Sequence, residues 1–181
     1  MFIKQLNQQT ISPLSNTFLF ELANIPLEDQ SLLKKLSLRA LNMIYTYTNG
    51  RVVTETNFEI YIDLADVALA QRLPVRPIFD IASVSVFNID NEETTLLDTS
   101  YHFVQGDSAI FFKTFPSDVR SERTFKITMS AGYDAQNTPL DLIAAVEQLT
   151  IFLYENRGDS MTTEIPLSIR MLLDPYVIHR L

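Results

Sequence analysis

The sequence predicts an α+β protein in which N- and C-terminal helices pack together and an antiparallel β-sheet or small sandwich is inserted between them. Apolar residues recur with a helical period early in the chain, alternating strands and turn residues fill the middle, and the helical period then returns. We therefore expect a single domain over residues 1–181. It has a helical part (15–50 and 138–175), a β insertion (52–131) and a C-terminal tail (176–181).

The composition is typical of a folded protein with one core. The chain has 181 residues, of which 46% are hydrophobic, and no cysteine, so disulfides and thiolate chemistry are excluded. No apolar run approaches the length of a membrane span, and the N-terminal stretch MFIKQLNQQT lacks the apolar region of a signal peptide. We therefore expect that the protein does not contact a membrane. We also expect that it is assembled in the cytoplasm.

The charge balance is acidic. The chain has 22 acidic and 14 basic residues and a net charge of -8, and its Lys and Arg residues do not interleave with aromatic residues in one cluster. A nucleic-acid groove requires such a cluster to hold phosphates and bases. The sequence therefore predicts no specific binding of DNA.

The N-terminal part begins with an arm. Residues 1–15 predict an extended segment that is ordered only where a neighbour covers it. Ser15 or Asn16 is a suitable N-cap for a short helix over 17–23.

A longer amphipathic helix follows. It begins near Leu27, with Glu28 and Asp29 at its positive end, and Asn49-Gly50 closes it. Its apolar face recurs at spacings of three and four residues and consists of Leu32, Leu33, Leu36, Ala40, Met43, Ile44 and Tyr47.

The pattern then changes to the period of a strand. Residues 52–64 alternate between apolar and polar side chains, which is typical of a half-buried strand. Because two prolines with only two residues between them do not fit a central strand, residues 73–77 are expected to form an edge or connector. We expect a meander with further strands at 81–89, 94–97, 101–104, 109–113 and 123–131.

The helical period returns at Thr138, a suitable N-cap, with Pro139 as the first helical residue. Arg157 and Gly158 end this helix. A short second helix opens at Pro166 and ends at Asp174-Pro175, because the residue before a proline avoids helical angles.

No residue set predicts catalysis, a cofactor or a metal ion. The four glycines, at positions 50, 106, 132 and 158, end helices or strands or lie in a turn, so none belongs to a phosphate-binding loop. His102 and His179 lack cysteines or spaced carboxylates beside them. The carboxylate pairs Glu92-Glu93 and Asp63/Asp66 fall in a turn and at a strand end, where solvated charge is the ordinary interpretation.

Three residues are candidates for contacts between subunits. Phe111 and Phe112 point to opposite faces of one strand, so one belongs to the core and the other can meet a neighbour; Phe112 is the candidate. Tyr154 and Arg157 form a second candidate patch, although an Arg that compensates the helix dipole explains this segment equally well.

Several short motifs resemble the head-to-tail connector (adaptor) proteins of tailed phages, prophages and gene transfer agents. Together they cover roughly residues 17–176 in order. The motifs are Glu28-Asp29-Gln30-Ser31-Leu32-Leu33, Ala40, Tyr47, Thr48-Asn49-Gly50-Arg51, Ala131-Gly132-Tyr133, Pro139, Ala145-Val146, Tyr154-Glu155-Asn156-Arg157-Gly158, Ile165-Pro166, Leu172-Leu173 and Pro175-Tyr176.

The resemblance implies a structural virion protein without enzymatic activity or cofactors. Such proteins form a ring, typically of twelve copies, that docks below the portal protein in the virion neck. The ring continues the DNA channel, without specific DNA binding, to the next connector (stopper) or tail protein. In this family the C-terminal region reaches toward the portal. The portal-interface candidates are therefore Tyr176, Val177, Ile178, His179, Arg180 and Leu181.

Three alternatives stay open from the sequence. The chain could be another phage structural module, such as a tail-completion or stopper protein, or a small enzyme or ligand-binding domain with a β-walled pocket. The apolar C-terminal tail could also fold back on its own helices instead of docking on the portal.

Overall fold

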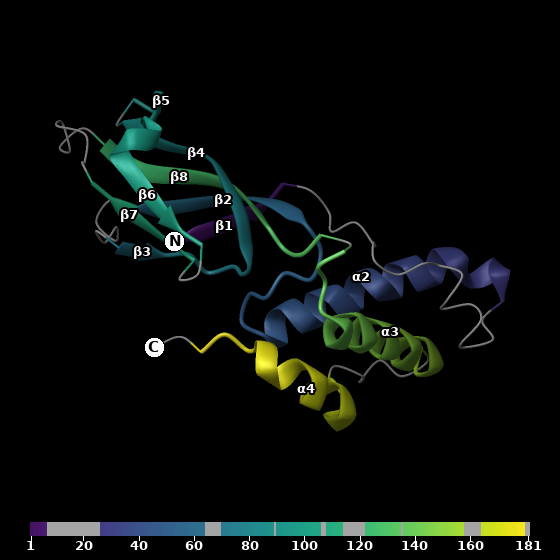
Figure 1. The fold of residues 1–181 in the computed structure, drawn as a ribbon. Coiled ribbons are helices and arrows are strands. Elements are labelled where there is room, and N and C mark those ends of the chain that lie inside the picture. The colour runs from purple at the N-terminus through teal and green to yellow at the C-terminus, as the bar shows by residue number, and fades with distance from the viewer. Residues whose placement is uncertain are drawn as a thin grey trace. The chain divides into compact units, whose positions relative to one another are not determined.

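The computed structural model describes residues 1–6, 26–63, 70–88, 90–105, 108–113, 122–134, 136–157 and 164–179. The fold is α+β, as predicted, and the chain divides into two compact units where the sequence suggested one domain (Figure 1). The β unit comprises residues 1–8 and 55–132, and the helical unit comprises 9–54 and 133–181. The short helix expected over 17–23 lies outside the described residues.

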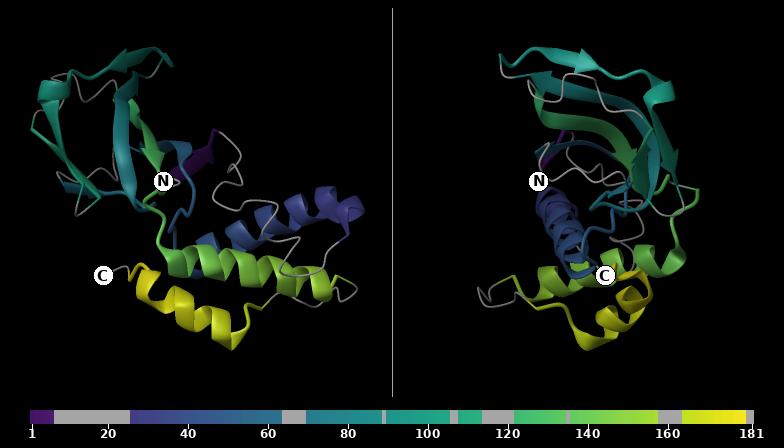
Figure 2. Two further views of the ribbon diagram at one scale, coloured as in Figure 1. Left: turned by 45° about the vertical axis from the view of Figure 1, so that its right-hand side comes forward. Right: turned by 90° about the vertical axis from the view of Figure 1, so that its left-hand side faces the viewer.

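The helical unit is built on α2 (Gln30–Tyr47), α3 (Leu140–Glu155) and α4 (Leu167–Leu173). The 3-10 turns η1 (Leu27–Asp29) and η4 (Asp174–Tyr176) precede α2 and follow α4. Helix α3 packs against both α2 and α4, as Figures 1 and 2 show. Within the described residues, every helix is too short or too polar to span a bilayer.

The core of this unit confirms the predicted apolar stripes. Leu33, Leu36, Ala40 and Ile44 of α2 are buried, as the spacing of three and four predicted. They form one cluster with buried residues of α3 and α4, namely Leu142, Ala145, Val146, Leu149, Leu153, Ile169 and Leu173. Each helix therefore buries its stripe against the others.

The start of α3 differs from the prediction. Pro139, and not Thr138, is the residue that precedes the first helical position. The Thr138 hydroxyl donates to the carbonyl of Asp134 at 2.7 Å, so it closes the preceding turn and does not cap the helix. The carboxylate of Asp134 accepts hydrogen bonds from Asn137 and Gln136, which lower its pKa. The Thr138 hydroxyl is therefore used within the turn, and no side chain caps the start of α3.

The β unit holds two antiparallel sheets with the orders β1-β2-β8-β4-β5 and β3-β7-β6. The predicted meander is therefore wrong in its order, because β8 lies between β2 and β4. A 3-10 turn, η3 (Asp98–Ser100), precedes β6. The strands are β1 (Phe2–Gln5), β2 (Thr56–Asp63), β3 (Ala70–Arg72), β4 (Ile78–Asn88), β5 (Glu93–Thr95), β6 (Tyr101–Val104), β7 (Ala109–Phe112) and β8 (Glu122–Ala131).

Strand alternation gives the large sheet one buried face. Phe58, Ile60 and Ile62 of β2 are buried, whereas the residues between them are half-buried. The aromatic rings of Phe112 on β7 and Phe125 on β8 lie 5.2 Å apart, which joins the two sheets. Figure 2 shows these strands from two further sides.

The opposite face of the large sheet carries paired charges. Lys126 Nζ of β8 lies 3.0 Å from Glu93 Oε1 and 3.7 Å from Glu59 Oε1, and Lys4 Nζ of β1 lies 3.4 Å from Glu59 Oε2. Burial raises the pKa of Glu59, but hydrogen bonds from Tyr61 and Lys4 outweigh it and leave this pKa below its usual value. The arm predicted for residues 1–15 thus begins as an edge strand that is held on β2.

Candidate functional site

The motifs that carried the family resemblance meet in space at two places in the helical unit. At the first, which we call the helix-end cluster (Asp29, Tyr154 and Arg157), the start of α2 meets the end of α3. The Tyr154 hydroxyl donates to Asp29 Oδ2, and Arg157 Nη1 lies 3.9 Å from the same oxygen. The Arg157 guanidinium lies 4.4 Å from the centre of the Tyr154 ring.

The charges of the helix-end cluster suit the two helix ends that they occupy. The Asp29 carboxylate lies beside the first turn of α2, where it interacts favourably with the positive end of the helix dipole. The Arg157 guanidinium interacts in the same way with the negative end of the α3 dipole. The amide of Asn156 donates to the carbonyl of Phe152 at 2.8 Å and closes the last turn of α3. Tyr154 and Arg157, predicted to contact a neighbouring subunit, therefore bind within their own chain. The Arg157 side chain is still 54% exposed.

The second place, the Arg51 cluster (Arg51, Tyr133 and Tyr176), joins residues from three distant motifs. Arg51 Nε donates to the Tyr176 carbonyl at 3.2 Å, and Nη1 donates to the Tyr133 hydroxyl at 3.3 Å. The guanidinium also lies 5.8 Å from the centre of the Tyr176 ring. A rigid fork of donors suits such a junction, which a lysine could not reproduce.

The chain reaches this junction through a sharp turn after α2. Asn49 and Gly50 have φ angles of 58° and 111°, which are in the left-handed region. The Thr48 hydroxyl, which is buried, donates to the Ile44 carbonyl at 2.7 Å. The Thr48-Asn49-Gly50-Arg51 motif therefore ends a helix and directs the Arg51 side chain toward the C-terminal segment.

The C-terminal segment packs on its own unit. Ile178 is buried, its N–H donates to the Thr48 carbonyl at 3.0 Å, and its carbonyl accepts a hydrogen bond from the Asn49 amide at 3.1 Å. The Tyr47 hydroxyl donates to Asp174 Oδ1 at 2.6 Å, which raises the pKa of Tyr47. For residues 176–178 the structure thus favours the fold-back interpretation. His179 is exposed, and Arg180 and Leu181 lie outside the described residues.

The other predicted interface residue, Phe112, is a core residue. It is buried in β7, and its neighbour Phe111 is the exposed one, with 38% of its surface accessible. The two side chains lie on opposite faces, as the alternation predicted, and within the single chain Phe112 is on the buried face. Periodicity alone does not say which face meets the second sheet.

Several residues considered for chemistry lie on the surface. His102 of β6 and the carboxylates of Glu92 and Glu93 are exposed. Asp66 is outside the described residues. Among the described residues, no three His, Asp or Glu side chains gather closely enough to hold a metal ion.

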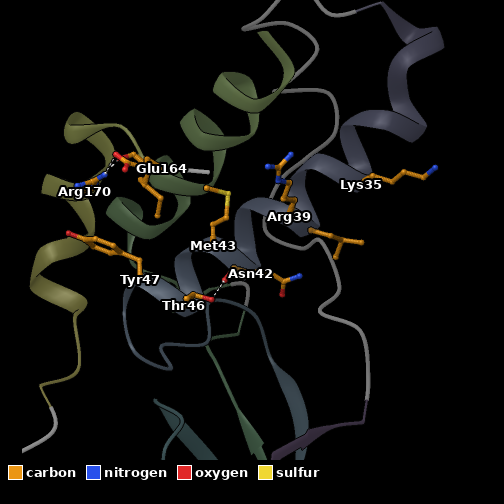
Figure 3. A pocket seen from close by; sticks show the side chains of 10 residues that line it. Lys35, Arg39, Asn42, Met43, Thr46, Tyr47, Glu164 and Arg170 are labelled. Carbon is orange, nitrogen blue, oxygen red and sulfur yellow. Dashed lines mark hydrogen bonds and ion pairs between the residues drawn. The ribbon is translucent and has the colours of Figure 1, made fainter. Parts of the chain in front are cut away.

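The helical unit also has a groove that the sequence did not predict. Its volume is about 770 Å³, and α2 forms one wall while Glu164, Ile165 and Arg170 form the other (Figure 3). Lys35 and Arg39 line it from α2. One signal could have revealed it: α2 carries three basic residues and no acidic residue in an acidic chain.

The helix-end cluster leads to a stability prediction. Replacing Tyr154 by Phe should cost about 1–2 kcal/mol of unfolding free energy, because the Asp29 carboxylate loses a donor. Urea denaturation followed by circular dichroism measures this. Asp29→Ala made in the Tyr154→Phe background should cost clearly less than in the natural chain. Strict additivity of the two changes would contradict the contact.

No protein-family model matches the sequence, and no curated protein matches it. A chain in the neck of the empty gene transfer agent particle, computed with C6 symmetry, has a TM-score of 0.82 and 16% identity. The superposition covers 100% of this chain and 97% of the other.

This chain has the fold of a protein from a gene transfer agent neck. A chain in the virion of the native gene transfer agent particle agrees, with a TM-score of 0.81 and 18% identity. A chain in the native particle's neck, computed with C12 symmetry, has a TM-score of 0.73 and 20% identity. Each superposition covers 100% of this chain and 97% of the other. The family resemblance drawn from the motifs is confirmed at the level of the fold.

Proposed function

We propose that this protein is a structural virion protein, a head-to-tail connector of the adaptor type. Twelve copies form a ring beneath the portal protein, in the virion neck, and the ring continues the DNA channel toward the next connector or tail protein. It is assembled in the bacterial cytoplasm and catalyses no reaction. DNA passes through the ring without specific binding.

The observation that carries this proposal is the full-length likeness to chains in the gene transfer agent neck. The likeness covers 100% of the chain, with TM-scores of 0.73 to 0.82. Both units of this chain are therefore similar to parts of those chains, and not one unit alone. The necks of those particles were computed with C6 and C12 symmetry, and the C12 symmetry supports a ring of twelve here. The net charge of -8 is consistent with a channel that does not hold phosphate.

The ligand-binding alternative has less support. It required a pocket walled by strands, whereas the groove described above is lined by α2, by Arg170 of α4 and by Glu164 and Ile165, which precede α4. The stopper alternative shares the neck location and differs in which neighbour the chain contacts. The portal contact of residues 176–181 remains a prediction; because residues 176–178 bind their own unit, we propose that this segment contacts the portal in its folded-back conformation.

Deleting the gene tests the proposal. We expect heads that contain DNA but lack tails, because the portal then has no connector to which a tail can attach. Electron microscopy counts the tailed particles, and a plasmid copy of the gene should restore them. Normal tailed, infectious particles without the protein would overturn the proposal. Particles that lose only a later tail part would favour the stopper alternative.

A further inference from the structure

The groove has the lining of a protein-binding site. Its α2 wall is a stripe of residues on successive turns, from Lys35 to Thr46. Leu38 and Met43 give it half-buried apolar surface, and Ile165 on the opposite wall is buried. Figure 3 shows Lys35 and Arg39 along the same helix. Across from it lies Arg170, which is paired with Glu164 at 3.2 Å, so Lys35 and Arg39 supply the positive charge of the α2 wall. An apolar lining with cations beside it suits an acidic protein segment.

The charge of α2 is opposite to that of the whole chain. Its 18 residues contain Lys34, Lys35 and Arg39 and no Asp or Glu, while the chain has a net charge of -8. All three cations are exposed. A copy of the same chain therefore carries an excess of acidic residues that this helix can attract.

One acidic surface of the chain lies at the described residues of the turn between β4 and β5, where three hydrogen bonds converge on Asn88. In the turn between β4 and β5, Asn88 Oδ1 accepts the N–H groups of Asp90 at 2.9 Å and Glu92 at 2.8 Å. The Asn88 amide donates to Glu92 Oε2 at 2.9 Å, and Asn91 has a φ of 62°. Asp90, Glu92 and Glu93 are all exposed. These hydrogen bonds hold Asp90 and Glu92 beside Asn88, which lowers the entropic cost of ordering the two acidic residues on binding.

Cyclic symmetry requires two different surfaces on every copy. In a ring of more than two copies the interface is heterologous, so a patch on one copy meets another patch on the next. The solved particles with this fold are described with C12 and C6 symmetry. We propose, resting on the ring of the proposed function, that the α2 groove of one copy binds the acidic β4–β5 turn of the next copy.

Two complementary variants test this contact. The groove variant carries Lys35→Glu and Arg39→Glu, and the turn variant carries Asp90→Lys and Glu92→Lys. Each alone places like charges together at every interface of the ring. We expect the amount of the protein in purified particles, relative to the capsid protein, to fall about tenfold or more.

Co-expression of the two variants should restore incorporation. When the variants alternate around a ring with an even number of copies, every acidic groove meets a basic turn and every basic groove meets an acidic turn. A contact within one chain could not be restored in this way. The matched controls are Lys34→Glu, on the same helix outside the groove lining, and Glu55→Lys, away from the turn. Both should enter particles as the natural chain does.

The outcomes separate this inference from the function on which it rests. If the natural chain itself does not enter particles, the proposed function fails. If the natural chain enters and the variants enter equally well, or the mixture is not restored, the contact is overturned. If only the groove variant fails, the groove binds another partner, such as DNA or the portal, and the inference is again overturned.

Discussion

Ending the chain after Asp174 is expected to lower the unfolding free energy of the helical unit by about 3–5 kcal/mol. The truncation removes the buried Ile178 side chain, whose burial contributes about 2 kcal/mol. It also removes the hydrogen bonds that join Ile178 to Thr48 and Tyr176 to Arg51, each worth about 1 kcal/mol. Urea denaturation followed by circular dichroism at 222 nm measures the loss.

Two point variants control for the truncation. Ile178→Ala should reproduce about half of the loss, because it removes the buried side chain but keeps the backbone bonds. His179→Ala, at the exposed neighbouring position, should change the unfolding free energy by less than about 0.5 kcal/mol. Unchanged stability of the truncated chain would show that this segment does not fold back in solution.

The second large effect is expected in the β unit. Phe112→Ala should cost about 3–5 kcal/mol, because it leaves a cavity beside Phe125 where the two sheets meet. Phe111→Ala, one residue earlier on the exposed face, should cost no more than about 1 kcal/mol. Thermal unfolding of the purified variants measures both.

The comparison also separates a core role from an interface role. If Phe112 contacted another subunit, its replacement would reduce particle incorporation and leave the isolated protein stable. Equal and small losses of stability at positions 111 and 112 would contradict the packing of the two sheets.

The helices were predictable because their signals are local. The stripe of α2 recurs at spacings that place Leu33, Leu36, Ala40 and Ile44 on one side, and these residues are buried. The helix ends at Tyr47, next to the predicted Asn49-Gly50 stop. Consecutive residues of the stripe are only about one helical turn apart, so a short window of sequence is enough to reveal it.

The order of the strands was not predictable in the same way. Alternation in residues 56–63 shows which side chains share a face, but it does not identify the neighbouring strands. The last strand, β8, is inserted between β2 and β4, which are earlier in the chain. β1 was missed because its four residues include Lys4 and Gln5 and give no clear apolar alternation.

The residues of the candidate site could be singled out from the sequence, but the contacts between them could not. The motifs around Asp29, Arg51, Tyr154 and Tyr176 were recognised separately, and the sequence gives no sign that Asp29 meets Tyr154 or that Arg51 meets Tyr176. These partners are about 125 residues apart, so only the packing of the helices brings them together. Tyr154, Arg157 and Tyr176 were expected to bind neighbouring proteins, and in the structure they stabilise the helical unit of their own chain.

Electron cryomicroscopy of intact particles from the source organism tests the central proposal most directly. We predict density for this chain in the neck, in contact with the portal protein, in twelve copies around the DNA channel. The two units should each fit that density as described here, with the β4–β5 turn against the neighbouring copy's α2. Density for the chain only in the head or in the distal tail, or its absence from the particle, would contradict the account.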